Sequence, residues 1–281
     1  MNLPRPHDPR KRHGIALFAG AVFASVVPTF ANTPTKPPIR TAPVTFVSCP
    51  IYRDTDQGPK SGCWLADDYA TGVRYDIGQG RTKPQVGRMV LVEGIPAPAP
   101  NLCGGAVLKP VHTSPLASTC PAVILPAENF PGRPFVLRLD HVLPPADVVR
   151  PLPQGPFANK RWAIEFDYRS DFLAYQYSEV ILDAIARYVR ASHPIEVRVE
   201  GYAATRPYVV SGMRLVEPPQ LAEDRADRVA RALRRLGVDR KIMRVRSSVN
   251  PRPAAIDDGL AQPSLRRVTI RVELARDRPE R

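Results

Sequence analysis

The residue with the most distinctive chemical setting is Arg225, in the first turn of a helix predicted from Leu221 to Leu236. At about 100° per residue, the apolar side chains of this helix fall in one arc roughly 140° wide, and Arg225 lies inside that arc. An arginine on the core side of a first helical turn can bind an anion through its planar fork. It can equally lie along the apolar surface or pair with an internal carboxylate. The pattern therefore predicts either an anion site or an internally satisfied guanidinium.

The segment before this helix supplies the other polar candidates. Gly201 follows a predicted strand and is followed by Tyr202, Thr205 and Arg206. Tyr202 is either a packing residue or a hydroxyl that contacts sugar or peptide. The loop 203–220 is too long for a tight turn, so it forms one wall of a groove or is an insertion. Three acidic residues, Glu217, Glu223 and Asp224, could supply a carboxylate to a binding site formed here, but the sequence does not place their side chains.

Three short motifs resemble the OmpA-like C-terminal domain of bacterial envelope proteins. Leu221-x-x-x-Arg225-Ala226 is similar to the family's second-helix motif, Arg266-Arg267-Val268 to its last strand, and Gly201 to its glycine turn. The resemblance covers about residues 158–276. It implies non-covalent binding of peptidoglycan, in which an aspartate and an arginine hold the charged groups of the stem-peptide diaminopimelate. The residues it places at that site are Arg225, Tyr202, Thr205, Arg206, Leu221, Arg266 and Arg267.

The match is incomplete at one functional position. Where the family has Gly-His-Thr-Asp, this chain has Gly201-Tyr202-Ala203-Ala204, so the aspartate that would hold the ligand's ammonium group is missing. Arg225 remains available for a carboxylate. Two functions therefore stay open: a non-catalytic envelope protein that associates with peptidoglycan, or a periplasmic interaction or scaffold module on the same fold that has lost this binding. Of the paired arginines, alternation along a strand predicts that only one faces the site, while the other is solvated or pairs with Glu273.

Hydrophobic periodicity predicts the elements that position these residues. Strand-like alternation occurs at 162–166, 195–199 and 268–274, a short strand fits 243–245, and helical periodicity occurs at 180–189 and 221–236. The predicted fold class is α+β, with a β-α-β-α-β-β sandwich whose two helices cover one sheet face.

The preceding region, residues 44–143, reads as a small disulfide-bonded all-β domain. Apolar runs at 44–47, 73–77, 89–95, 106–111, 122–125 and 135–139 predict six short strands, in a closed or sandwiched arrangement such as an OB fold. An even number of cysteines in an exported chain predicts two disulfides among Cys49, Cys63, Cys103 and Cys120. Three connectivities are open. Cys49–Cys63 with Cys103–Cys120 is favoured because each bond closes a short local loop.

The segments that precede and connect these two regions predict the cellular location of the chain. Residues 1–31 have the basic and apolar segments of a signal peptide, 32–43 form a tether, and 144–157 form a proline-rich linker. No later stretch is long and apolar enough to span a membrane as a helix. The predicted location is the periplasm, with outer-membrane association left open. The net charge of +13 favours anionic surroundings.

The sequence gives no indication of catalysis. It contains no nucleophile elbow, no zinc-protease motif and no phosphate-binding glycine loop. We therefore expect no enzyme activity, no cofactor and no metal site, since His112 has no histidine or C-x-x-C pair nearby. The basic helix face lacks the aromatic residues and motifs of nucleic-acid binding. The predicted partners are the peptidoglycan stem peptide and, as a second class, other envelope proteins.

Overall fold

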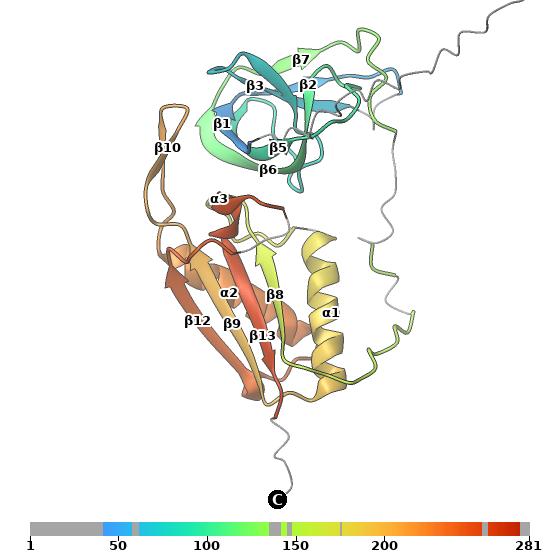
Figure 1. Ribbon diagram of the computed structural model, residues 1–281, viewed down its shortest axis with the longest axis vertical. Helices are drawn as coiled ribbons and strands as arrows, with labels where there is room; N and C mark the ends of the chain where they lie inside the picture. The colour runs from blue at the N-terminus through green and yellow to red at the C-terminus, as the bar shows by residue number, and fades with distance from the viewer. Residues whose placement is uncertain are drawn as a thin grey trace, which may run out of the picture. The chain divides into compact units, whose positions relative to one another are not determined.

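The computed structural model describes residues 42–57, 62–134, 142–144, 148–174, 176–254 and 258–275 (Figure 1). The predicted signal peptide, all but the last two tether residues and the predicted strand at 135–139 lie outside these ranges. All the elements below belong to one compact unit, Arg40–Arg281. Within the described ranges, no helix has the length and apolar character needed to cross a membrane.

The first half folds as a small β-barrel. Its strands are β1 (Val44–Ser48), β2 (Pro50–Arg53), β3 (Cys63–Asp68), β4 (Val73–Asp76), β5 (Arg88–Pro96), β6 (Ala106–Thr119) and β7 (Val123–Leu125). The sheet order is β1-β5-β6-β4-β3-β2-β7, with β4 and β6 parallel. Because only Cys49 separates β1 from β2, one nearly continuous strand pairs with β5 at one end and with β3 at the other. This closes the sheet in the OB-type arrangement.

Five of the six predicted strands are confirmed, and the sixth lies outside the described residues. Sequence periodicity missed β2 and β3, which are short and carry the polar residues Arg53, Asp67 and Asp68. Strand β6 extends to Thr119, well beyond the predicted end at 111, because it pairs with β5 as far as Arg88. Pairing with a neighbour, rather than local pattern, sets these boundaries.

The favoured disulfide pairing is wrong. The structure joins Cys63 to Cys103, with a Cα–Cα distance of 5.7 Å and a sequence separation of 40. The register of β2 against β3 places Cys63 opposite Arg53, which is four residues beyond Cys49. Cys49 and Cys120 are free thiols in contact with each other. Burial and the hydrogen bond with Cys49 raise the pKa of Cys120 to about 12.

The second half is the predicted α+β sandwich. Its elements are β8 (Lys160–Glu165), α1 (Tyr177–Ser192), β9 (Glu196–Ala203), β10 (Tyr208–Val210), β11 (Met213–Leu215), α2 (Gln220–Arg235), a 3₁₀ turn (Arg240–Ile242), β12 (Met243–Val249), α3 (Ala261–Ser264) and β13 (Arg267–Glu273). The main sheet has the order β12-β9-β13-β8 (Figure 1). Inward-facing residues of β8, β9 and β13 form one core with α1 and α2, so both helices cover the same face. The hairpin β10–β11 and helix α3 are additions to the predicted order.

Gly201 occupies strand β9 rather than the predicted turn. It pairs with Ser247 on one side and with Val268 on the other. A Cβ at this position would come within 2.0 Å of the Ala222 carbonyl oxygen and 2.9 Å of Ala226 Cβ. Glycine is therefore required because α2 packs directly against the strand backbone.

The barrel and the sandwich share a hydrophobic cluster. Val47, Leu91 and Leu116 of the barrel pack against Tyr168 of the sandwich and against Val210 and Leu215 of the hairpin β10–β11. Val47 N also donates a hydrogen bond to Ser211 Oγ at 3.0 Å, at the tip of the hairpin. The hairpin therefore packs against the barrel, and this contact fixes the course of the chain between β9 and α2.

Candidate functional site

Arg225 is fully buried, with an exposed fraction of 0%. Its guanidinium donates to both Glu217 carboxylate oxygens, at 3.0 and 2.7 Å, and to three backbone carbonyls. Those carbonyls belong to Ser170 at 2.9 Å, Tyr202 at 2.8 Å and Asp167 at 3.2 Å. These bonds use all five donor positions of the side chain. Burial lowers the pKa of Arg225, and its bond to Glu217 opposes that shift.

Glu217 is the residue that closes this site. It lies between β11 and α2, is 1% exposed, and also accepts hydrogen bonds from Arg169 N at 2.8 Å and Ala204 N at 2.9 Å. Ala204 stands where the resembled family has its aspartate, so the backbone of that position binds Glu217. Of the two alternatives for Arg225, the internally satisfied guanidinium is the one observed, with Glu217 as its carboxylate partner. The hairpin β10–β11 returns the chain so that this carboxylate reaches the arginine.

Arg266 also has an internal ion-pair partner. It is 0% exposed and forms a buried ion pair with Glu93 of β5, with an Nη1–Oε1 distance of 3.3 Å. Burial alone would lower its pKa, but the charge and hydrogen bonds of Glu93 raise it. Glu93 follows the apolar run 89–92 of β5, and an acid in such a run is a sequence signal for a buried cation.

Arg267 faces the opposite side of the strand but is equally enclosed. It is 5% exposed, donates to the Ser264 carbonyl oxygen, and lies 4.8 Å above the ring of Tyr202. Burial lowers its pKa. The expectation that one arginine of the pair is solvated or bound to Glu273 is therefore wrong. Glu273 instead lies 3.5 Å from Arg198.

The remaining predicted site residues lie close to these arginines without forming an open site. Tyr202 has its pKa raised to about 12, by burial and by a hydrogen bond with Glu200. The amides of Thr205 and Arg206 both donate to Asn250 Oδ1 at 2.8 Å, while the Arg206 side chain is exposed. Leu221 is buried against Ala203 and Ala222. Tyr202, Thr205 and Arg225 thus surround one strand end, but internal partners occupy their polar groups.

An open pocket of about 690 Å³ lies next to the closed arginine site. Its wall includes the segment Asp167–Ser170, whose backbone binds Arg225 and Glu217. Three exposed arginines, Arg88, Arg169 and Arg214, line it. Among the described residues, none of their guanidinium groups has a carboxylate partner.

The other lining groups leave this pocket predominantly cationic and partly apolar. Phe172 is 66% exposed at the pocket, and Leu116 and Leu215 are buried beneath it. The pocket's one acidic group among the described lining residues is Asp167, whose pKa is raised by burial, although a hydrogen bond from Thr82 opposes the shift. Sequence reasoning did not identify this pocket, because its arginines come from β5, the β8–α1 loop and β11.

Comparison with known proteins gives partial structural likenesses. The OmpA-like domain of FopA1 from Francisella tularensis is 21% identical, with a TM-score of 0.33 over 41% of this chain and 71% of that chain. The periplasmic domain of Helicobacter pylori MotB is 21% identical, with a TM-score of 0.33 over 42% and 76%. The peptidoglycan-associated lipoprotein from Burkholderia pseudomallei is 28% identical, with a TM-score of 0.30 over 40% and 89%. No protein-family model and no curated protein matches the chain.

Proposed function

We propose that this chain is a non-catalytic periplasmic envelope protein that associates non-covalently with peptidoglycan, and that it does so at the arginine-lined pocket rather than at Arg225. The observation that carries the proposal is a set of three exposed guanidinium groups in one pocket, those of Arg88, Arg169 and Arg214, which have no carboxylate partner in the part of the chain that the structure describes. Arg225 is unsuited to the role in this conformation because Glu217 already fills the position of a ligand carboxylate.

The chemistry of the pocket suits a stem peptide. Arginine forks bind carboxylates bidentately, and stem peptides present free carboxylates along with short apolar side chains. The exposed ring of Phe172 offers a surface for the apolar part. A volume of about 690 Å³ is within the range of about 300–1,000 Å³ usual for ligand sites. The chain's net charge of +13 would also favour approach to the anionic wall.

Sedimentation with purified peptidoglycan sacculi tests this proposal. We expect the wild-type chain to co-sediment, and Arg169→Ala/Arg214→Ala to reduce the bound fraction at least several-fold. Arg234→Ala/Arg235→Ala removes the same charge from the exposed face of α2 and is the matched control. Exposed substitutions of this kind change the free energy of unfolding by only about 0.5 kcal/mol, so a difference in bound fraction between the two variants should not result from a difference in stability.

Two results would overturn the pocket assignment. The first is a wild-type chain that stays in the supernatant at moderate salt. The second is an equal loss of binding in the pocket variant and in the α2 variant, which would mean that net charge alone attracts the chain to the wall.

A second candidate function is a protein-interaction module of the envelope. It is favoured because Glu217 closes the Arg225 site, and because Ala204 stands where the resembled family has an aspartate. A photo-reactive group at Phe172 tests it in the periplasm. Protein cross-links that disappear in Arg169→Ala/Arg214→Ala, together with no binding to sacculi, would support this function. Binding to sacculi without cross-links would exclude it.

A further inference from the structure

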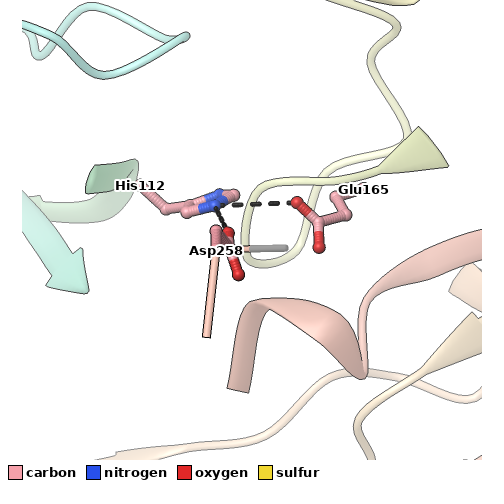
Figure 2. A group of neighbouring side chains, drawn as sticks. All are labelled: His112, Glu165 and Asp258. Atoms are coloured by element: carbon pink, nitrogen blue, oxygen red, sulfur yellow. Dashed lines mark hydrogen bonds and ion pairs between the residues drawn. The ribbon is translucent and has the colours of Figure 1, made fainter. Parts of the chain in front are cut away.

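Three potential metal ligands meet where the barrel contacts the sandwich. His112 lies in β6, Glu165 ends β8, and Asp258 precedes α3. Figure 2 shows both carboxylates turned toward the imidazole of His112. Their ligand atoms all lie within 4.8 Å of one another. The three residues are far apart in sequence, so only the tertiary structure assembles the group.

The distances suit a small divalent cation. His112 Nε2 lies 2.9 Å from Asp258 Oδ2 and 3.6 Å from Glu165 Oε2. Bonds of about 2.0–2.2 Å from nitrogen and oxygen to zinc, in tetrahedral geometry, place ligand atoms about 3.4 Å apart. Small side-chain rotations of Asp258 and Glu165 would therefore bring all three atoms into a coordination sphere.

The burial of these side chains separates the group from an ordinary surface ion pair. The side chains of His112 and Glu165 are each 6% exposed, and that of Asp258 is 17% exposed. Glu165 Oε1 is buried and has no hydrogen-bond partner among the described residues. An unsatisfied buried carboxylate oxygen is costly, and a cation bound by both oxygens of Glu165 would compensate it.

The surrounding charges are compatible with a cation. The two ligand carboxylates bring a formal charge of −2, and the partly buried Asp167 lies close by. Arg81 opposes a cation, since its Nη1 lies 3.5 Å from Glu165 Oε2. Its side chain is 39% exposed, so it can withdraw into solvent.

We propose that His112, Glu165 and Asp258 form a divalent-cation site, with zinc the favoured ion because it accepts imidazole together with carboxylate oxygen. Three protein ligands leave a fourth position for water. A cation bound here would link the barrel to the sandwich, because β6 belongs to one and β8 and α3 to the other.

Zinc titration of the metal-depleted full chain tests the proposal. We expect one equivalent to bind, and His112→Ala and Asp258→Asn each to weaken binding at least tenfold. His193→Ala, at the exposed C-terminus of α1, is the matched control and should bind as the wild type does. Zinc should also raise the melting temperature of the wild type and not that of His112→Ala.

X-ray absorption at the zinc edge identifies the ligands independently of any variant that fails to fold. Nitrogen and oxygen neighbours at about 2.0–2.2 Å would support the site. Sulfur neighbours at about 2.3 Å would assign the zinc to Cys49 and Cys120 and overturn the proposal. No binding by the wild type, or unchanged binding by His112→Ala, would also overturn it and leave the imidazole as a polar contact between two carboxylates.

Discussion

Glu217→Ala is the substitution that most directly tests the closed arginine site. In the wild type, the Glu217 carboxylate accepts four hydrogen bonds, two from Arg225 and one each from the amides of Arg169 and Ala204. Alanine would leave a guanidinium without a counter-charge at a position that is 0% exposed. It would also leave two amides without acceptors.

The magnitude follows from these contacts. Removing one partner of a buried ion pair costs about 3–5 kcal/mol, because the remaining charge is desolvated without compensation. Each buried amide left without an acceptor costs about 1–3 kcal/mol unless water enters the cavity. We therefore expect a loss of at least about 4 kcal/mol, a large part of the roughly 5–15 kcal/mol that stabilises a typical domain.

Urea unfolding measures this loss as a lower midpoint at unchanged slope. The control is Asp227→Ala, because the Asp227–Arg231 pair is exposed and its closest atoms lie 3.9 Å apart. That variant should lose no more than about 0.5 kcal/mol. Acetate should restore part of the stability of Glu217→Ala by entering the vacated position beside Arg225, and should not affect Asp227→Ala.

The reasoning is refuted if Glu217→Ala loses less than about 1 kcal/mol, or no more than Asp227→Ala. Either result would mean that water or another group satisfies Arg225 when Glu217 is absent. The site would then be open enough to admit an external carboxylate, and the original expectation of an arginine-based wall site would return.

Three further predictions concern the framework around the site. Gly201→Ala should destabilise the protein by about 1–3 kcal/mol or more, because its Cβ would strike the α2 backbone; Gly155→Ala, whose Cβ would meet nothing closer than 3.6 Å, should cost much less in the same urea assay. Replacing Cys63 and Cys103 by serine should lower the unfolding free energy by roughly 4 kcal/mol for a separation of 40 residues, and dithiothreitol should then have no further effect on the variant. The pKa of Tyr202 is raised from 10.0 to about 12, so its neutral phenol contributes folding stability that is fully present below pH 10 and is lost as the pH rises to 12. Tyr202→Phe should therefore flatten the dependence of the unfolding free energy on pH in that window. An unchanged slope between pH 10 and 12 would contradict the assignment.

The sequence by itself determined the α+β class, the order of the main strands and helices, and the presence of a β-rich first half. Local periodicity carries this information, since strand and helix repeats of about 2 and 3.6 residues mark the buried faces directly. It also identified Arg225 as a guanidinium on the core side of α2, with an internal carboxylate as one of the alternatives.

Tertiary structure alone decided which carboxylate meets each arginine. Glu217 reaches Arg225 because the hairpin β10–β11 returns the chain to α2, and Glu93 reaches Arg266 because the barrel packs against the sandwich. The Cys63–Cys103 bond likewise follows from strand register rather than from loop length. Ion pairs and disulfides depend on atoms a few ångströms apart in space, and separation along the chain does not encode that distance.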